Sequence, residues 1–188
     1  MVGAQAGALV LNDLKVIAPA SGEVLFQAPL REIPKEGRSV RGYDLQGPVL
    51  FLPAERAFLT WEAEVTLLRR EGGLYRLSPS TGQKELLLPV SATLLGGQWR
   101  AADLALDGDG RHLYVAEKLE VRGPGALSLL LFDLQRRQVL CRNVLAKDQW
   151  TGAPKLVLGT RSLGLAYLEE GTGTLVLREY GLNSSRKP

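Results

Sequence analysis

Hydrophobic residues in this chain come in short runs of four to eight, and Gly, Pro, Ser, Asp and Asn separate the runs. Short apolar runs between turn formers are typical of β-strands, whereas a helix needs a longer segment with apolar residues three and four apart. Fourteen such runs predict an all-β domain. Residues 54–71 are the longest candidate for a helix, because their composition would tolerate one, but the repeat described next favours strands there.

Pairs of predicted strands recur along the chain. LKVIAPASGEVL at 14–25 matches LYRLSPSTGQKE at 74–85, and in each a strand leads into an SG or TG turn and then a second strand. The glycine supplies the positive φ that a tight hairpin needs. A different pair, VLFLPAERAFLTWEAE at 49–64, matches LALDGDGRHLYVAEKL at 104–119 and aligns Glu62 with Glu117. The unit is therefore four strands joined by hairpins.

Four copies of this unit are predicted within one domain that spans residues 1–188. Their approximate bounds are 8–30, 43–90, 99–145 and 150–182. A period of about 45–60 residues lies in the range of β-propeller blades.

Two segments resemble the blades of YVTN-type propellers, which are WD40-like repeat proteins. They are LALDGDGRHLYVAE at 104–117 and LKVIAPASGEVL at 14–25, although the chain has neither a WD nor a GH dipeptide. The resemblance implies a radial array of four-stranded antiparallel blades. It implies no particular activity, because a fold of this kind hosts many functions.

The predicted strands make about three and a half blades, and a propeller needs at least four to close. Three arrangements stay open. The chain closes as a small ring of four blades, or it is the C-terminal part of a larger propeller that lacks its N-terminal half, or two copies complete one ring as a homodimer.

Composition narrows the classes of partner. The chain has 188 residues, with 23 Lys and Arg against 20 Asp and Glu, and the charges alternate without a basic stripe. Nucleic-acid binding needs clustered positive charge, so we expect no nucleic-acid partner. The chain has neither an apolar run of about 18 residues nor a basic N-terminal leader, so we expect no membrane span and a cytoplasmic location.

The segment DGDGRH at 107–112 has the composition of a calcium loop or of a hairpin turn. A calcium loop needs oxygen ligands at alternating positions, and Arg111, Leu113 and Val115 stand where they should follow. We therefore predict a turn and no metal, with His112 as a turn residue. Cys141 is predicted to be a buried or half-buried apolar residue rather than a nucleophile.

Aromatic residues stand at similar positions before three of the predicted first strands. They are Tyr43, Trp99 and Trp150. In a propeller these positions lie in loops at the mouth of the channel, where the rings would bind a partner, but packing between blades is favoured. The polar residues near them that we include in the candidate binding site are Arg41, Arg100 and Asp103.

Phosphate-binding, nucleophile-elbow and triad patterns do not fit the sequence, so no cofactor is expected. We predict a noncatalytic module that binds a protein or another macromolecule through its loop face. Two alternatives stay open. One is a ligand-binding or enzymatic propeller that handles a quinone or a sugar at the channel, and the other is a fragment without independent function.

Overall fold

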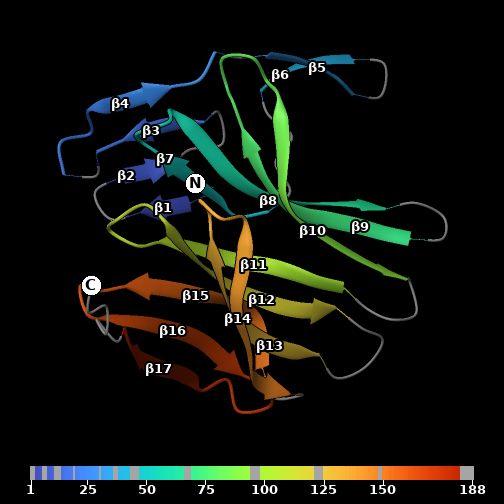
Figure 1. The fold of residues 1–188 in the computed structure, drawn as a ribbon, viewed down its shortest axis with the longest axis vertical. Helices are drawn as coiled ribbons and strands as arrows, with labels where there is room; N and C mark the ends of the chain where they lie inside the picture. The colour runs from blue at the N-terminus through green and yellow to red at the C-terminus, as the bar shows by residue number, and fades with distance from the viewer. Residues whose placement is uncertain are drawn as a thin grey trace. The chain divides into compact units, whose positions relative to one another are not determined.

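The computed structural model describes residues 3–5, 8–10, 14–18, 20–29, 31–35, 38–42, 47–65, 69–93, 98–120, 125–147 and 150–182. Within these ranges the regular structure is entirely β-strand, in seventeen strands (Figure 1). The predicted all-β fold class is therefore confirmed. The segment considered for a helix forms strands instead.

Each of four sheets has its strands side by side in chain order. The first contains β1 (Gly3–Gln5), β2 (Ala8–Val10), β3 (Lys15–Ile17) and β4 (Val24–Gln27). The second contains β7 (Val49–Leu52), β8 (Ala57–Val65), β9 (Arg69–Leu77) and β10 (Lys84–Thr93). The third contains β11 (Gln98–Leu106), β12 (His112–Glu120), β13 (Ala126–Asp133) and β14 (Gln138–Lys147). The fourth has three strands: β15 (Trp150–Leu158), β16 (Ser162–Glu169) and β17 (Leu175–Gly181).

A separate two-stranded sheet, made of β5 (Arg31–Lys35) and β6 (Arg38–Gly42), lies between the first two sheets in the sequence. These two strands and β1 were not predicted. The segment REIPKEGRSVRG is mostly polar and contains a proline, so it lacks the apolar run on which the sequence interpretation depended.

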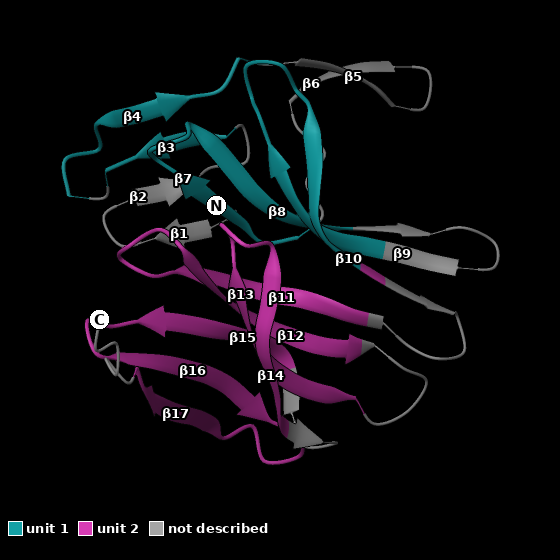
Figure 2. Ribbon diagram, in the orientation of Figure 1, with its two compact units in different colours: residues 1–64, 72–89 teal, residues 65–71, 90–188 magenta. Residues whose placement is uncertain are grey.

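The chain divides into two compact units (Figure 2). Unit 1 contains residues 1–64 and 72–89, and unit 2 contains residues 65–71 and 90–188. That the whole chain is a single domain stays a prediction.

The core of unit 1 joins its two large sheets. Three phenylalanine rings lie together in it, with centroids 5.3 Å apart for Phe26 and Phe51 and 5.1 Å apart for Phe51 and Phe58. Leu14 and Val16, beside and in β3, are buried in the same cluster. In β7 all four residues, VLFL, are buried, so side chains on both sides of this strand are covered.

The core of unit 2 lies between the third and fourth sheets. Ala116 and Leu127 from the third sheet pack with Leu165 and Tyr167 from β16. The first strands of these two sheets, β11 and β15, are also in contact, as β1 and β7 are in unit 1.

A four-residue hairpin loop recurs in both units. It joins β3 to β4, β9 to β10 and β16 to β17, and its last residue is a glycine in the left-handed region: Gly22 at φ 71°, Gly82 at 69° and Gly173 at 67°. In each loop a Ser or Thr hydroxyl accepts a hydrogen bond from the backbone N–H two residues later, at 3.1–3.3 Å. The predicted SG and TG turns are therefore confirmed.

The last strands of the four large sheets carry most of the exposed aliphatic residues among those that the structure describes. Seven of the nine large aliphatic side chains that are exposed in the described part of the chain lie on β4, β10, β14 or β17. Cys141 lies on β14 and is exposed as well, so the prediction of a buried or half-buried cysteine is wrong. The sequence did not reveal that its strand is the outermost one. None of the described residues belongs to a helix that is long and apolar enough to cross a membrane.

Candidate functional site

The structure describes only part of the predicted aromatic site. Tyr43 lies outside the described residues, as do the side chains of Arg41 in β6 and Trp150 in β15. The other three residues, Trp99, Arg100 and Asp103, all lie on β11 and are half-buried. Their grouping into one binding site therefore stays a prediction.

Trp99 lies within a strand rather than in a loop before one. It is the second residue of β11 and pairs with Leu119 of β12. The guanidinium of Arg142 lies over the indole, 5.6 Å from the ring centroid. A cation in this position is worth about 0.5–1 kcal/mol where it is solvent-accessible. The ring is thus already in contact with a cation of its own sheet.

Asp103 connects the two sheets of unit 2. Its Oδ2 accepts a hydrogen bond from the backbone N–H of Leu156, at 2.9 Å, and the Lys155 ammonium lies 3.8 Å from Oδ1. Burial raises the pKa of the Asp103 carboxyl, an effect that the Leu156 N–H and Lys155 oppose. These contacts explain Asp103 as a link between β11 and β15.

A buried polar network lies on the third sheet beside Trp99. Glu117 of β12 is 0% exposed, and its Oε2 accepts hydrogen bonds from Ser128 Oγ at 2.8 Å and Arg142 Nε at 2.9 Å. Arg142 comes from β14 and reaches across β13 to do this. The aligned residue in unit 1, Glu62, also has a basic partner from the last strand of its sheet, with both of its oxygens 2.7 Å from the Lys84 ammonium.

This second pair supports the alignment of the two segments and explains why both positions are Glu. A carboxylate at that point of the second strand can hold a long basic side chain that crosses the third strand. Because buried charges persist only when they are paired and hydrogen-bonded, the Glu117 network is explained by packing.

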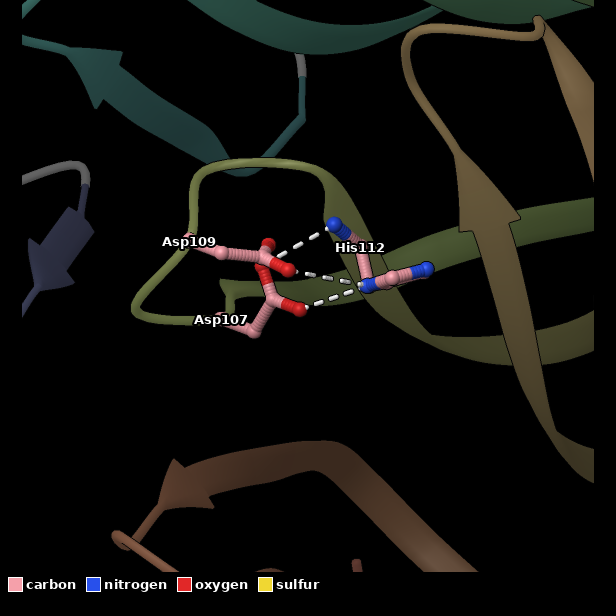
Figure 3. A group of neighbouring side chains, drawn as sticks. All are labelled: Asp107, Asp109 and His112. Carbon is pink, nitrogen blue, oxygen red and sulfur yellow. Dashed lines mark hydrogen bonds and ion pairs between the residues drawn. The ribbon is translucent and has the colours of Figure 1, made fainter. Parts of the chain in front are cut away.

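The segment around DGDGRH forms the hairpin between β11 and β12, so the predicted turn is confirmed. Figure 3 shows the carboxylates of Asp107 and Asp109 directed toward the same ring nitrogen of His112. Asp107 Oδ2 lies 2.7 Å and Asp109 Oδ2 lies 3.6 Å from His112 Nδ1. His112 itself is the first residue of β12 and is buried, which corrects its placement as a turn residue.

These three side chains bring two oxygens and one nitrogen within 4.8 Å of one another. That donor set suits a divalent transition metal. The same carboxylates, however, already serve the backbone of the turn. Asp107 Oδ1 accepts from the N–H groups of Arg111 and His112, at 3.1 and 2.9 Å, and Asp109 Oδ1 accepts from Arg111 N–H at 2.8 Å. Burial and the neighbouring Asp109 raise the pKa of Asp107. The geometry therefore accounts for these residues as the frame of a hairpin.

A different surface was not predicted. Strand pairing places one set of side chains on the side of the fourth sheet that is opposite to the core, and we call this set the outer face of β15–β17. Its members are Lys155, Val157, Gly164, Ala166, Leu168, Leu175, Leu177 and Glu179. The four large aliphatic residues are strongly exposed: Leu177 at 73%, Val157 at 66%, Leu175 at 59% and Leu168 at 41%.

Leu168, Leu175 and Leu177 lie close together on this face, and Gly164 and Ala166 lie between them and Val157. Leu168 is directly opposite Leu175, and Ala166 is directly opposite Leu177. Directly paired residues of an antiparallel sheet lie on the same side, about 5 Å apart. No signal in the sequence identifies this patch. The apolar residues of a strand show that it has an apolar side, but they do not show whether another element covers that side.

Comparisons of the chain with protein-family models, with curated protein sequences and with solved structures gave no match.

Proposed function

We propose that this chain is a noncatalytic interaction module that binds a protein partner at the outer face of β15–β17. One observation carries the proposal: four large aliphatic side chains are exposed on one side of one sheet, with Gly164 and Ala166 between Val157 and the three leucines. Soluble monomers rarely expose a contiguous apolar patch of this kind, and such patches are typical of binding surfaces.

The charged residues around the patch also favour a protein-binding surface. Lys155 and Glu179 lie on the two flanking strands of the outer face, and the residues between them are apolar. An apolar centre with charged side chains at its rim is the usual composition of a protein interface.

We also propose that the four large sheets are blades of a propeller-like array. Three features support this: the strands of each sheet follow one another in chain order, the first strands touch within each unit, and the last strands carry most of the exposed aliphatic residues among those described. In such an array the outer face of β15–β17 would be the side of a blade that a neighbour covers.

A matched pair of variants tests the proposed surface. Leu177→Glu puts a charge at the centre of the outer face. Leu140→Glu puts the same charge on β14, where the leucine is also exposed but lies outside the face. The wild type and both variants are immobilised, and the proteins that each retains from a cell extract are quantified.

We expect some proteins to be retained equally by the wild type and Leu140→Glu but at least about tenfold less by Leu177→Glu. Circular dichroism and thermal melting show whether each variant is folded. Identical retention by all three folded proteins would rule out the outer face as the binding surface.

A further inference from the structure

We infer that the outer face of β15–β17 binds the same face of a second copy of this chain. This inference rests on the proposed function and names the partner. It starts from the distribution of charge on the outer face, which carries one cation on one flanking strand and one anion on the other.

The pairing register gives the positions of these charges. Lys155 on β15 is in line with Ala166 and Leu177, and Val157 on β15 is in line with Gly164 and Glu179 on β17. The two charges therefore lie on opposite sides of the sheet's middle strand and in adjacent rows. The Lys155 side chain is 65% exposed despite its loose contact with Asp103, and Glu179 is exposed.

If two copies are related by a two-fold axis parallel to the strands, the cation of each copy comes near the anion of the other. When two such faces meet, β15 of one copy lies over β17 of the other. Each Lys155 then lies over Leu177 of the second copy, and Glu179 of that copy is one row away, about 7 Å along the strand and within reach of the lysine side chain. This contact occurs twice. A two-fold interface requires a surface that complements itself, and a face with opposite charges on its two edges meets this requirement.

The apolar residues are arranged to close over one another in the same geometry. Val157 from one copy would lie one row away from Leu177 of the other, and the Leu168 side chains of the two middle strands would lie against each other. Gly164 and Ala166 along the middle strand have no bulky side chain to hold the two backbones apart. Sheets that pack face to face lie about 10 Å apart with their strands nearly aligned.

The opposite side of this sheet already packs in this manner within unit 2. Leu165 and Tyr167 of β16 lie against Ala116 and Leu127 of the third sheet. A sheet-on-sheet contact is thus the mode by which β15–β17 buries the side that faces the core. The strand arrangement differs, because β11 and β15 lie together in that contact and β15 would lie over β17 in the dimer.

Light scattering on the full chain tests the inference. We expect the wild type to have the mass of a dimer at about 100 µM and to dissociate on dilution. Leu177→Glu should be a monomer at every concentration, and Leu140→Glu should remain a dimer. A monomeric wild type, or a Leu177→Glu variant that is still a dimer, would overturn the inference.

Exchanging the charges at positions 155 and 179 tests directly whether the partner is a second copy of the chain. Glu179→Lys alone and Lys155→Glu alone should each weaken the dimer about tenfold, because like charges then face each other. The two together should restore affinity to near the wild-type value. Thermal melting of each variant is recorded, because Lys155→Glu also places a carboxylate beside Asp103.

Failure to restore the dimer would overturn the two-fold pairing. The two proposals can fail separately. A monomeric wild type that still retains other proteins through Leu177 excludes the second copy and leaves the interaction module standing. Retention that does not depend on Leu177, with no dimer, excludes both.

Discussion

The third and fourth sheets of unit 2 have similar strands but different surroundings. In β13 of the third sheet seven of the eight residues are buried, whereas in β16 of the fourth sheet buried and more exposed residues alternate. The two strands have similar sequences, ALSLLLFD and SLGLAYLE. Both middle strands are apolar, yet β13 has buried side chains on both of its sides and β16 on one side only.

This difference teaches that strands of similar sequence can have one side covered or both. An apolar side of a sheet that nothing covers is unfavourable in water, so an exposed sheet side is usually polar. The fourth sheet departs from this rule, because its outer face carries Val157, Leu168, Leu175 and Leu177. A sheet side of this composition is suited to binding another molecule, and this is the basis of the proposed function.

The largest expected effect would come from truncating a leucine on each sheet. Leu130 of β13 is fully buried, so Leu130→Ala should lower the free energy of unfolding by about 3 kcal/mol. Leu177→Ala on the exposed face should change it by less than about 0.5 kcal/mol. Urea unfolding at a concentration low enough to exclude a dimer measures both. Similar losses for the two variants would show that the sheets are covered alike.

A second prediction concerns polar contacts, whose contribution to the free energy of unfolding should also depend on burial. Glu117→Ala removes a fully buried carboxylate and leaves the Ser128 hydroxyl and Arg142 without its hydrogen bonds, so it should destabilise the chain by about 2 kcal/mol. Glu169, which bonds to the Thr172 hydroxyl at the surface of the fourth sheet, provides the control. Glu169→Ala should cost less than about 0.5 kcal/mol in the same unfolding experiment. Equal costs would mean that the Glu117 network is accessible to water.

The elements of this fold could largely be predicted from the sequence. Short apolar runs identified strands such as β8, β12 and β13, and glycine after Ser or Thr identified the hairpin loops at Gly22 and Gly82. These signals are local, since they depend on chain conformation within about ten residues. Strands β5 and β6 lack an apolar run, so the same signal could not find them.

The candidate site could not be predicted to the same extent. Whether Leu177 is buried or Trp99 is accessible depends on which sheet lies opposite, and that is a contact between residues far apart in the chain. Cys141 was misjudged for this reason. Its neighbours Leu140 and Val144 are apolar, but β14 is an outermost strand and exposes them all.

A third, smaller effect should appear as a dependence on pH in the third sheet. Asp133 is almost fully buried at the end of β13, and Arg111 donates two hydrogen bonds to its Oδ2, at 3.0 and 2.7 Å. This pairing and the N–H groups of Gln135 and Arg136 hold the pKa of Asp133 well below its ordinary value. The ionised carboxylate therefore stabilises the fold above the unfolded-state pKa of about 4, and that contribution is lost as pH falls below it.

The matched variant Asp133→Asn keeps an oxygen that can accept from the turn but has no charge to pair with Arg111. We expect it to melt at a lower temperature than the wild type at pH 7. The difference should narrow between pH 5 and pH 3, because the wild-type carboxylate becomes protonated on unfolding. A difference in melting temperature that stays constant over this range would contradict the role of the charge.

The smallest effect concerns the hairpin loop that the two sheets share. In the fourth sheet the last residue of the β16–β17 loop is Gly173 at φ 67°, whereas Arg137 holds the same position in the β13–β14 loop at φ 54°. A residue with a Cβ atom is strained in this region by about 1–2 kcal/mol, and glycine is not, although it gains entropy when the chain unfolds. Arg137→Gly should therefore stabilise the chain by about 0.5 kcal/mol.

The neighbouring residue Arg136 has no positive φ, so Arg136→Gly should destabilise the chain by a similar amount through entropy alone. If both variants lower the midpoint of urea unfolding, then the contacts of the Arg137 side chain outweigh the strain, and the two sheets differ in their turns as well as in their surroundings.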